Sequence, residues 1–285
     1  MKIPVESLNL LMLNMGYARH HGDWNWKNIQ SPFTRIFLVT EGMARLHTEN
    51  GTVELTPNHL YIIPAGTQHS YECDGLFTLY YLHIYEGFKN ETDVFNCYDF
   101  PTEVEATELD TMLMEQLASS HPEAKLPSSD PRSYDNGGTF SDNIRRYNQM
   151  PLHERMMARG SILMLFSKFL ASAKPRIWTT DKRLTKVLQY INNNIYDDID
   201  IQVLADEACV TKHYLIRIFR RCFGIAPLQY INRKKIEKAQ LMLITSDFAI
   251  KELAFTLGFN TPAYFCRLFK HIAGCTPQEY RRNCK

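Results

Sequence analysis

LADEACVTKHYLIRIFRRCFGIAPLQY, residues 204–230, returns in altered form as LAFTLGFNTPAYFCRLFKHIAGCTPQEY, residues 253–280. Six residues recur fifty positions later in the sequence: Tyr214, Arg217, Phe219, Gly224, Pro227 and Tyr230 correspond to Tyr264, Arg267, Phe269, Gly274, Pro277 and Tyr280. The pair Leu204-Ala205 returns as Leu253-Ala254, one residue short of that distance, so the second copy has one extra residue before its second helix. A repeat with one such insertion indicates a duplicated structural unit.

The first copy has the signals of two short helices joined by a turn. Asp200 is a suitable N-cap for a helix over 201–208, and Thr211 for a second helix that ends near Phe223, because side-chain oxygens of these types accept hydrogen bonds from first-turn N–H groups. Gly224 then supplies the left-handed residue that commonly follows a helix. Two such helices with a turn of three or four residues between them form a helix-turn-helix.

The second copy repeats these signals. Asp247 is predicted to cap a helix over 248–257, and Gly258 lies in the turn. Thr261 is predicted to cap the second helix, whose first position holds Pro262, where the fixed φ and the missing N–H cost nothing. This helix is predicted to run for about ten residues and to end before a glycine.

The second helix of each copy has an apolar face and a basic one. Apolar residues at i, i+3 and i+4 predict burial of Leu215, Ile218, Phe219, Phe265, Leu268 and Phe269. The opposite face holds the residues that we assign to base reading: His213, Ile216, Arg217, Pro262, Ala263, Cys266 and Arg267. An Arg at the same place in both copies fits recognition of guanine, because Arg donates two hydrogen bonds to O6 and N7 in the major groove. A solvated basic face would explain either Arg alone, but it explains their matched placement poorly.

Flanking polar residues are assigned to DNA phosphates: Thr211, Lys212, Arg220, Arg221, Asn260, Thr261, Lys270 and His271. A predicted helix from Pro227 to about Thr245 connects the two copies. About 18 residues at ~1.5 Å per residue span ~27 Å, whereas one turn of B-DNA spans ~34 Å. A rigid helix of this length, with the widths of the flanking units, is suited to hold two recognition helices about one turn of DNA apart.

Charge also divides the chain. Residues 182–285 hold 17 Lys and Arg against 9 Asp and Glu, a net of +8, whereas residues 1–181 hold 15 against 22, a net of −7. A basic part joined to an acidic part indicates a polyanion-binding module attached to something else, although chance variation between domains is an alternative. The apolar fraction of 45% is that of an ordinary globular chain, and no apolar run approaches the ~20 residues of a membrane span.

Residues 1–100 are predicted to form antiparallel β structure. Apolar or aromatic runs separated by Gly, Pro or Asn recur every 8–12 residues, as is typical of a sandwich or barrel: 35–42, 43–51, 52–57, 59–66, 69–73 and 76–87. Asn50-Gly51 predicts a tight hairpin turn with positive φ angles, and Asn58 is predicted to be left-handed. The segment TPNHLYIIPAGTQH resembles the second half of a cupin barrel through Pro64, Gly66 and His69.

Because many cupins are metalloenzymes, His69 raises the question of a metal site. Such a site needs three or four converging His or carboxylate ligands. The preceding hairpin offers His47 and Glu49 and has no His-x-His pair. We therefore predict no metal and no other cofactor, and we interpret His69 as a turn residue at the mouth of the barrel.

A barrel of this size can hold one small ligand. The candidate effector-binding residues are Trp24, Trp26, Tyr71, Tyr81 and His83. Aromatic faces with a polar edge suit sugars and other small polar metabolites. The alternative is that these aromatic residues belong to the core or to an interface.

Beyond the barrel, helical periodicity appears twice. It predicts helices at about 103–118 and 151–173, with a long irregular surface loop over 119–138 between them. These helices pack either on the barrel or on a second subunit. The segment KPRIWTT, 174–180, is predicted to be an interdomain linker.

The predicted fold class is multidomain α+β. Residues 1–173 form a cupin-like antiparallel β-barrel with accessory helices. Residues 181–285 form an all-α domain that opens with a helix at Asp181 and contains two helix-turn-helix units joined by the connector helix.

Residues 204–280 are similar to the DNA-binding domain of the AraC/XylS family of transcriptional regulators. The likeness is strongest in GFNTPAYFCRLFKHIAGCTPQEYR, 258–281, with IKELA at 250–254 before it. The N-terminal barrel looks like the effector-binding and dimerisation domain of the same family, with weaker motifs. Lys235 departs from the usual Arg and loses the bidentate fork, which puts a salt bridge there in doubt. Ile216 stands where a polar residue is common and indicates contact with a thymine methyl group.

The resemblance implies a cytoplasmic transcriptional regulator that is not an enzyme and that binds double-stranded DNA in two adjacent major grooves per monomer. Seven cysteines without a CxxC pair fit the same reducing compartment. The implied partners are a small polar effector such as a sugar, a second copy of the chain and RNA polymerase, with no membrane. Two alternatives stay open: a ligand-independent regulator whose barrel only dimerises, and a cupin enzyme with an appended DNA-binding domain. Activation rather than repression is the habit of the family.

Overall fold

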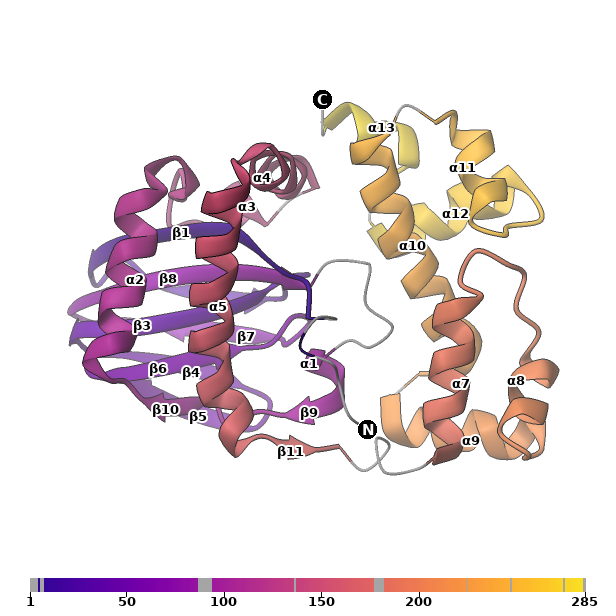
Figure 1. Cartoon of the computed structure of the whole chain (residues 1–285), viewed down its shortest axis with the longest axis horizontal. Coiled ribbons are helices and arrows are strands. Elements are labelled where there is room, and N and C mark those ends of the chain that lie inside the picture. Colours follow the sequence, from indigo (N-terminus) through magenta and orange to yellow (C-terminus); the bar gives the residue numbers. More distant parts are fainter. Residues whose placement is uncertain are drawn as a thin grey trace. The chain divides into compact units, whose positions relative to one another are not determined.

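The computed structural model describes residues 5, 8–86, 94–135, 137–176, 182–223, 225–246, 248–273 and 275–283. Contacts divide the chain into two compact units, one built mainly from residues 8–87 and 98–174 and the other mainly from residues 175–285 (Figure 1). In the part of the chain that is described, no helix has the length and apolar character needed to cross a bilayer.

Two larger antiparallel sheets form the centre of the first unit, and β9 (Tyr98–Asp99) and β11 (Lys174–Pro175) form a separate two-stranded sheet. The five-stranded sheet has the order β1 (Leu10–His21), β8 (Leu76–Glu86), β3 (Thr34–Gly42), β6 (His59–Ile63) and β10 (Glu103–Glu105). The four-stranded sheet has the order β2 (Trp26–Ile29), β7 (His69–Glu72), β4 (Ala44–Thr48) and β5 (Gly51–Leu55). The predicted cupin-like antiparallel domain is therefore confirmed.

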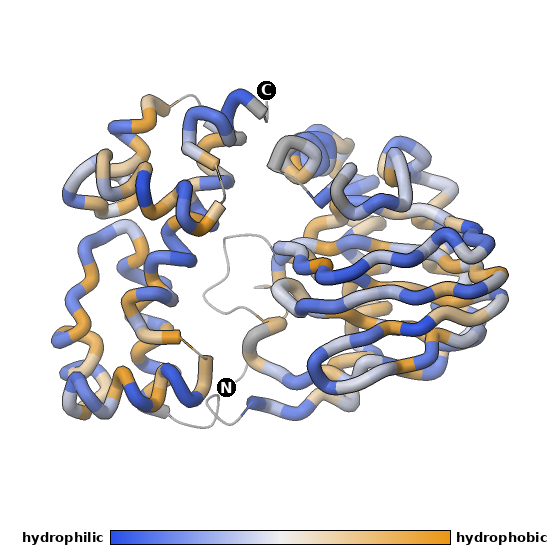
Figure 2. The backbone as a smooth tube through the Cα atoms, turned by 180° about the vertical axis from the view of Figure 1, so that it is seen from behind, coloured by the Kyte–Doolittle hydropathy of each residue, from blue (hydrophilic) through white to orange (hydrophobic). Residues whose placement is uncertain are grey.

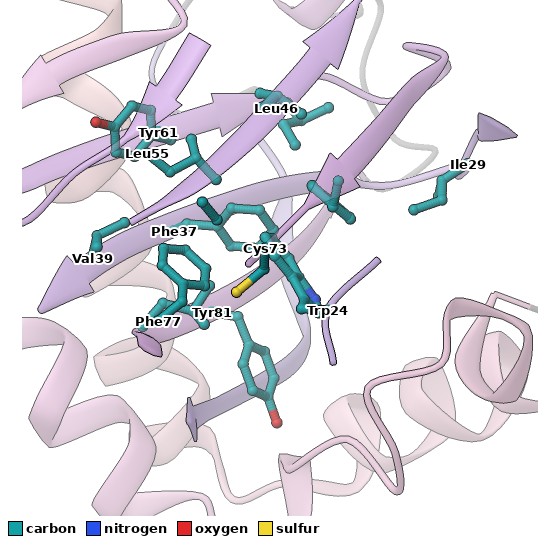
Figure 3. Packing of buried hydrophobic residues seen from close by; sticks show 14 residues of the cluster. Trp24, Ile29, Phe37, Val39, Leu46, Leu55, Tyr61, Cys73, Phe77 and Tyr81 are labelled. Atoms are coloured by element: carbon teal, nitrogen blue, oxygen red, sulfur yellow. The ribbon is translucent and has the colours of Figure 1, made fainter. Parts of the chain in front are cut away.

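Side chains alternate between the two faces of each strand, and those on the inward face fill the space between the sheets. On β3, Phe37 and Val39 point into an aromatic core that also contains Trp24 and Phe77 (Figure 3). Ile36 and its neighbours on the other face of β3 are buried as well. Helices α2 (Glu108–Ser120), α4 (Gly137–Gln149) and α5 (Leu152–Ser172) contact β1 and cover that outer face of the sheet (Figure 1).

The structure differs from several predictions for this unit. The longest strand, β1, falls in a segment that the sequence analysis did not assign to a strand. Residues 103–105 are strand β10, and α2 begins later than predicted, at Glu108, where Asp110 accepts a hydrogen bond from the Thr107 N–H at 2.7 Å. The predicted helix over 151–173 corresponds to α5.

The prediction of an irregular loop over 119–138 was correct only in part, since residues 125–130 have no regular structure. The rest of the segment contains the end of α2, a 3₁₀ turn η2 (Pro122–Ala124), helix α3 (Pro131–Tyr134) and the start of α4. Short elements α1 (Val94–Cys97), β9 (Tyr98–Asp99) and β11 (Lys174–Pro175) complete the assignment before the second unit. Residues 177–181, which include most of the predicted linker and Asp181, lie outside the described residues.

Turn geometry in the barrel agrees with the sequence at two of three positions. Asn58 is left-handed, with φ of 66°, and Gly51 has φ of 127°. Asn50 is not among the residues with positive φ, so the hairpin uses Gly51 alone.

The second unit is helical throughout. Its elements are α7 (Lys182–Asn193), α8 (Ile201–Glu207), α9 (Lys212–Phe223), α10 (Pro227–Thr245), α11 (Ile250–Thr256), α12 (Pro262–Ala273) and α13 (Pro277–Asn283). Hydrophilic and hydrophobic stretches follow one another along these helices (Figure 2). The helix predicted over 248–257 begins at Ile250, where the Glu252 carboxylate accepts a hydrogen bond from the Ala249 N–H at 3.0 Å. The predicted cap Asp247 and the glycines at 224 and 274 lie outside the described residues.

The sequence repeat is also a repeat of packing. Phe219 meets Tyr230 edge to face with ring centroids 5.7 Å apart, and Phe269 meets Tyr280 in the same way at 5.4 Å. The connector α10 contacts α9, α11, α12 and α13, and its buried residue Ala239 belongs to the core of the second copy. Each copy is thus a small aromatic core built on one end of α10.

Candidate nucleic-acid interface and barrel site

Side-chain caps begin both second helices of the repeat. The Thr211 hydroxyl accepts a hydrogen bond from the Tyr214 N–H at 3.2 Å, and Thr261 accepts one from the Tyr264 N–H at 3.3 Å. Pro262 occupies the first position of α12. Both predicted caps are confirmed, so α9 and α12 begin at equivalent points of their copies.

The turn that precedes each of these helices has the same geometry. Cys209 has φ of 53° and Gly258 has φ of 66°, in equivalent places. The Val210 N–H donates to the Ala205 carbonyl at 2.9 Å, and the equivalent bond in the second copy measures 3.0 Å. The two copies therefore present their second helices in the same way.

The outer faces of α9 and α12 carry the residues assigned to DNA. His213, Arg217, Ala263 and Arg267 are exposed, and Ile216, Pro262 and Cys266 are half-buried. The eight residues assigned to phosphates are all exposed: Thr211, Lys212, Arg220, Arg221, Asn260, Thr261, Lys270 and His271. Of the residues predicted to be buried, Ile218 and Leu268 are only half-buried, and the other four are fully buried.

Several of these side chains have partners within the chain. The Arg217 guanidinium lies 5.2 Å from the centre of the Tyr214 ring, and that of Arg183 lies 5.3 Å from it. Lys212 Nζ is 3.6 Å from an Asp200 carboxylate oxygen, with both groups largely exposed. Exposed ion pairs of this kind contribute little to stability, so Lys212 can exchange its partner for a phosphate at small cost.

A buried lysine joins the two copies. Lys235, on α10, is 3% exposed, and its Nζ donates to the Asp197 carbonyl at 2.6 Å and to the Gly258 carbonyl at 3.3 Å. A Cβ at Gly258 would lie 2.6 Å from the Tyr196 carbonyl oxygen. The turn of the second copy is thereby packed against the loop before the first copy. The partners of Lys235 are carbonyl oxygens, which an ammonium group can serve without the Arg fork.

The connector is close to the length expected from the sequence. Helix α10 has 19 residues, which span about 28 Å at ~1.5 Å per residue. Lys235 also ties the turn of the second copy and the loop before the first copy to α10.

In the barrel, most of the candidate effector-binding residues lie together. Trp24 stacks on Tyr71 with ring centroids 3.9 Å apart, and Tyr81 belongs to the same buried cluster (Figure 3). Trp26 packs against this cluster and is half-buried. His83 lies beside Tyr81, at 5.7 Å between ring centroids. The aromatic residues fill the interior against one another.

The charged residues of this interior were not predicted from the sequence. Arg35 lies on β3 two positions before Phe37 and is 1% exposed. Its Nη2 donates to Asp135 Oδ2 at 3.0 Å, and the Ser31 hydroxyl donates to the same oxygen. A signal for Arg35 was present, because an Arg that shares a face with Phe37 in an apolar strand must point into the barrel. The long separation to Asp135 left no comparable signal.

Burial sets the protonation states around Arg35. Burial, with the nearby charge of Arg35, lowers the pKa of His69 to about 4, and the same two causes hold the pKa of His83 well below 6.5. Burial raises the pKa of Tyr71 above its ordinary value. Both histidines are therefore neutral near pH 7, and the charges of this interior are those of Arg35 and Asp135.

His69 and His47 have protein partners. His69 is the first residue of β7 and is 2% exposed, with Nε2 at 2.9 Å from the Tyr71 hydroxyl and Nδ1 at 2.8 Å from the Thr67 carbonyl. It is thus a buried interior residue rather than an exposed turn residue. His47 Nε2 lies 3.0 Å from a Glu72 carboxylate oxygen. Over the described ranges, no three His, Cys, Asp or Glu side chains gather as metal ligands.

Comparison with known families gives one match in each unit. Residues 15–87 match the model of an AraC-like ligand binding domain, and residues 204–283 match that of a helix-turn-helix domain.

Curated relatives align with the C-terminal part of the chain. The regulatory protein PocR of Salmonella typhimurium is 31% identical over 102 residues, which are 36% of this chain and 34% of that protein. The arabinose operon regulatory protein of Escherichia coli is 32% identical over 106 residues, which are 37% of this chain and 36% of that protein. The chain thus spans about a third of the length of the relatives that it matches.

Among solved structures, the DNA-binding domain of AdpA in complex with a target DNA is 30% identical, with a TM-score of 0.33, covering 34% of this chain and 86% of that one. ToxT from Vibrio cholerae with a bound unsaturated fatty acid is 17% identical, with a TM-score of 0.48, covering 99% of this chain and 96% of that one.

Proposed function

The predicted resemblance to the AraC/XylS family is confirmed in both domains, and from this premise we propose that the protein regulates transcription by binding duplex DNA with both halves of its C-terminal repeat. Helices α9 and α12 enter two adjacent major grooves, and α10 holds them about one helical turn apart. The residues assigned to base reading and to phosphates above are the proposed contacts.

The matched exposure of Arg217 and Arg267 carries this proposal. Each lies on a helix with a Thr cap, in the same place relative to a buried Phe, and each is exposed. A structural role would bury such a side chain, and a face that is only solvent-exposed would not require the same residue type in both copies. An Arg on the outer face of a helix in the major groove is well placed to recognise guanine through two hydrogen bonds.

Selection from random duplex DNA by the purified full-length chain tests this function. The expected product is a sequence with two preferred blocks whose centres lie about 10 base pairs apart. Arg217→Ala should remove the preference in one block and Arg267→Ala in the other. Recovery of DNA without any preferred sequence would leave no role for the matched arginines.

We propose that the barrel domain binds a small polar effector. Sugars and similar metabolites bind to aromatic faces and polar edges. In the barrel, these groups come from Trp24, Trp26, Tyr71, Tyr81 and His83. The effector would favour whichever arrangement of the protein it binds better, which shifts the population of DNA-binding states. Activation, with RNA polymerase as a partner, is the outcome that we propose for this shift.

The accessory helices offer a surface for a second copy of the chain. Met112 on α2 is 64% exposed and Met156 on α5 is 66% exposed. Leu109 and Leu152 on the same two helices are also more than half exposed. Exposed apolar side chains on two helices that contact each other support the proposal of a homodimer. Sedimentation of the chain should show a dimer that Met112→Glu and Met156→Glu weaken.

A further inference from the structure

The interior of the barrel holds a charged group whose counter-charge comes from outside the strands. Arg35 shares the inward face of β3 with Phe37 and Val39 of the aromatic core. Its guanidinium carbon lies 4.8 Å from the centre of the Phe33 ring. A buried guanidinium is costly unless it is paired, so something must always occupy the place that Asp135 takes here.

Asp135 reaches Arg35 from the segment 121–135, which covers this part of the barrel. The Leu126 N–H donates to the Tyr81 hydroxyl at 2.8 Å, and Leu126 packs against the aromatic core. At the end of the segment, Tyr134 is 5% exposed and its hydroxyl hydrogen-bonds Arg35. The segment thus places three of its residues against the side chains that form the proposed effector site.

The pairing between Arg35 and Asp135 is incomplete. Arg35 Nε, Asp135 Oδ1 and His83 Nδ1 are all buried without a hydrogen-bond partner. Arg and a carboxylate can form two parallel hydrogen bonds, but Asp135 accepts from Nη2 with one oxygen and leaves the other unused. Burial raises the pKa of the Asp135 carboxyl in spite of the neighbouring Arg35, so desolvation of this carboxylate is not fully offset.

The backbone limits how the Asp135 carboxylate can be oriented. A free carboxylate ligand can rotate and form hydrogen bonds with atoms that Asp135 leaves unpaired. Because His69 and His83 are neutral near pH 7, removal of Asp135 leaves a net charge of one positive unit on Arg35. Such a site favours a single negative charge over a neutral molecule or a polyanion.

We propose that the barrel takes a small carboxylate on Arg35 in the place of the Asp135 side chain, and that the segment 121–135 is displaced when this ligand binds. The inference rests on the proposed function, since it names the chemical class of the effector. It narrows that class from polar metabolites such as sugars to molecules that carry a carboxylate.

Chemical rescue tests whether the site accepts a free carboxylate. Asp135→Ala removes a carboxylate group that formate can replace, whereas formamide has the same shape without the charge. Unfolding of the full chain is followed by tryptophan fluorescence, because Trp24 and Trp26 lie beside the site and are two of the three tryptophans in the chain. Asp135→Ala should lower the melting temperature by about 5 °C or more, and formate should restore most of this loss in a saturable way.

Matched variants define the outcomes. Asp142→Ala removes an exposed carboxylate of α4 that pairs with Arg145, and formate should not stabilise it more than formamide does. The double variant Arg35→Met/Asp135→Ala should also lose the rescue. Equal rescue by formamide, or rescue that survives in the double variant, would overturn the proposal. Stronger rescue by inorganic phosphate than by formate would overturn the assignment to carboxylates.

A second measurement uses the wild-type chain, so it does not depend on the folding of Asp135→Ala. Small carboxylates and their matched amides are screened for a rise in melting temperature, and the stabilising compounds are then tested by hydrogen–deuterium exchange. Carboxylates alone should stabilise the chain and should speed exchange of the amides in 121–135. Stabilisation by amides and carboxylates alike, or by no carboxylate, would contradict the proposal.

These results are separable from the DNA selection. Rescue by formate without any DNA preference would leave the ligand class standing and reject the regulator. A DNA preference without rescue would do the reverse.

Discussion

Lys235 Nζ lies 2.6 Å from the Asp197 carbonyl oxygen, in the loop between α7 and α8, and donates a second hydrogen bond to the turn of the other copy at Gly258. One buried lysine thus connects the connector helix with the turn of the second copy and with the loop that precedes the first copy. We expect the spacing of α9 and α12 to depend on this contact as well as on the length of α10. A family position that usually holds Arg is here filled by a residue that serves two carbonyls.

Replacement of this ammonium group should weaken the whole C-terminal unit. Lys235→Met removes the donor of two part-buried hydrogen bonds, which should cost about 1–3 kcal/mol in all. Urea unfolding should show the loss, and binding to a site with both blocks should weaken more than binding to one block. A matched control is Lys234→Met, since Lys234 lies on the same helix, is less buried than Lys235 and pairs with the partly exposed carboxylate of Glu237. Equal effects of both changes would mean that the charge of α10, and not the buried tie, matters.

Each turn should respond differently when it receives the residue that the other turn holds at the equivalent position. Gly258→Cys introduces a Cβ within 2.6 Å of backbone atoms at φ of 66° and should destabilise the chain by more than about 2 kcal/mol. Cys209→Gly, at φ of 53°, relieves left-handed strain and should change stability by no more than about 1 kcal/mol in the favourable direction. Thermal unfolding measures both. A comparable loss in the two variants would show that the turns are not equivalent.

The arginines on the outer faces should govern specificity. Arg217→Ala and Arg267→Ala should each cost about 1–3 kcal/mol of binding free energy and relax the preference at one base pair. Competition binding with operator variants measures this. The larger loss is expected for Arg217, because Tyr214 and the half-buried Ile216 hold its surroundings in place. Uniform losses on all sequences would instead make these residues phosphate anchors.

The flanking basic residues should set the dependence on salt. Lys212→Ala or Arg221→Ala should weaken binding to every sequence and lower the slope of log K against log salt by about one unit each. Titrations at several salt concentrations give the slope directly. As a control, Lys251→Ala changes an exposed lysine of α11 outside the assigned contacts and should leave the slope unaltered. An unchanged slope for Lys212→Ala would remove this lysine from the interface.

Stability of the barrel should fall on acidification. The pKa of His69 is about 4 in the folded chain, below the value of about 6.5 expected in the unfolded chain, so the unfolded state binds more protons between these pH values. The stability that neutral His69 contributes is present above pH 6.5 and is lost as the pH falls towards 4, by up to about 3 kcal/mol. Urea unfolding from pH 7.5 to 4.5 should show a smaller dependence on pH in His69→Asn. The exposed His153 provides the control, and an equal change in His153→Asn would contradict the assignment.

Local signals explain why the C-terminal unit could be predicted from sequence. The caps Thr211 and Thr261, the apolar period of α9 and α12, and the Pro at the start of α10 act within one or two helical turns. Each fixed an element boundary to within a few residues. The last helix, α13, has the same kind of signal in Pro277 but was not assigned.

The barrel was harder to predict because its strands and its cover depend on distant contacts. Strand β1 is buried on both faces along most of its length, so it lacks the alternation that marks a half-exposed strand. The Pro- and Ser-rich segment 119–138 has loop composition, yet Leu126 and Asp135 anchor its described part to the interior through contacts with Tyr81 and Arg35. Neither contact has a signature in the local sequence.

The most direct test of the two-headed arrangement is a change in the spacing of its DNA site. Five base pairs, about half a helical turn, are inserted between the two blocks obtained by selection, and affinity is measured at constant salt. If α10 and Lys235 hold α9 and α12 rigidly, affinity should fall to that of a single block, and Arg267→Ala should then have no further effect. Unchanged affinity for the lengthened site would contradict a rigid connector and with it the proposed recognition of two grooves by one chain.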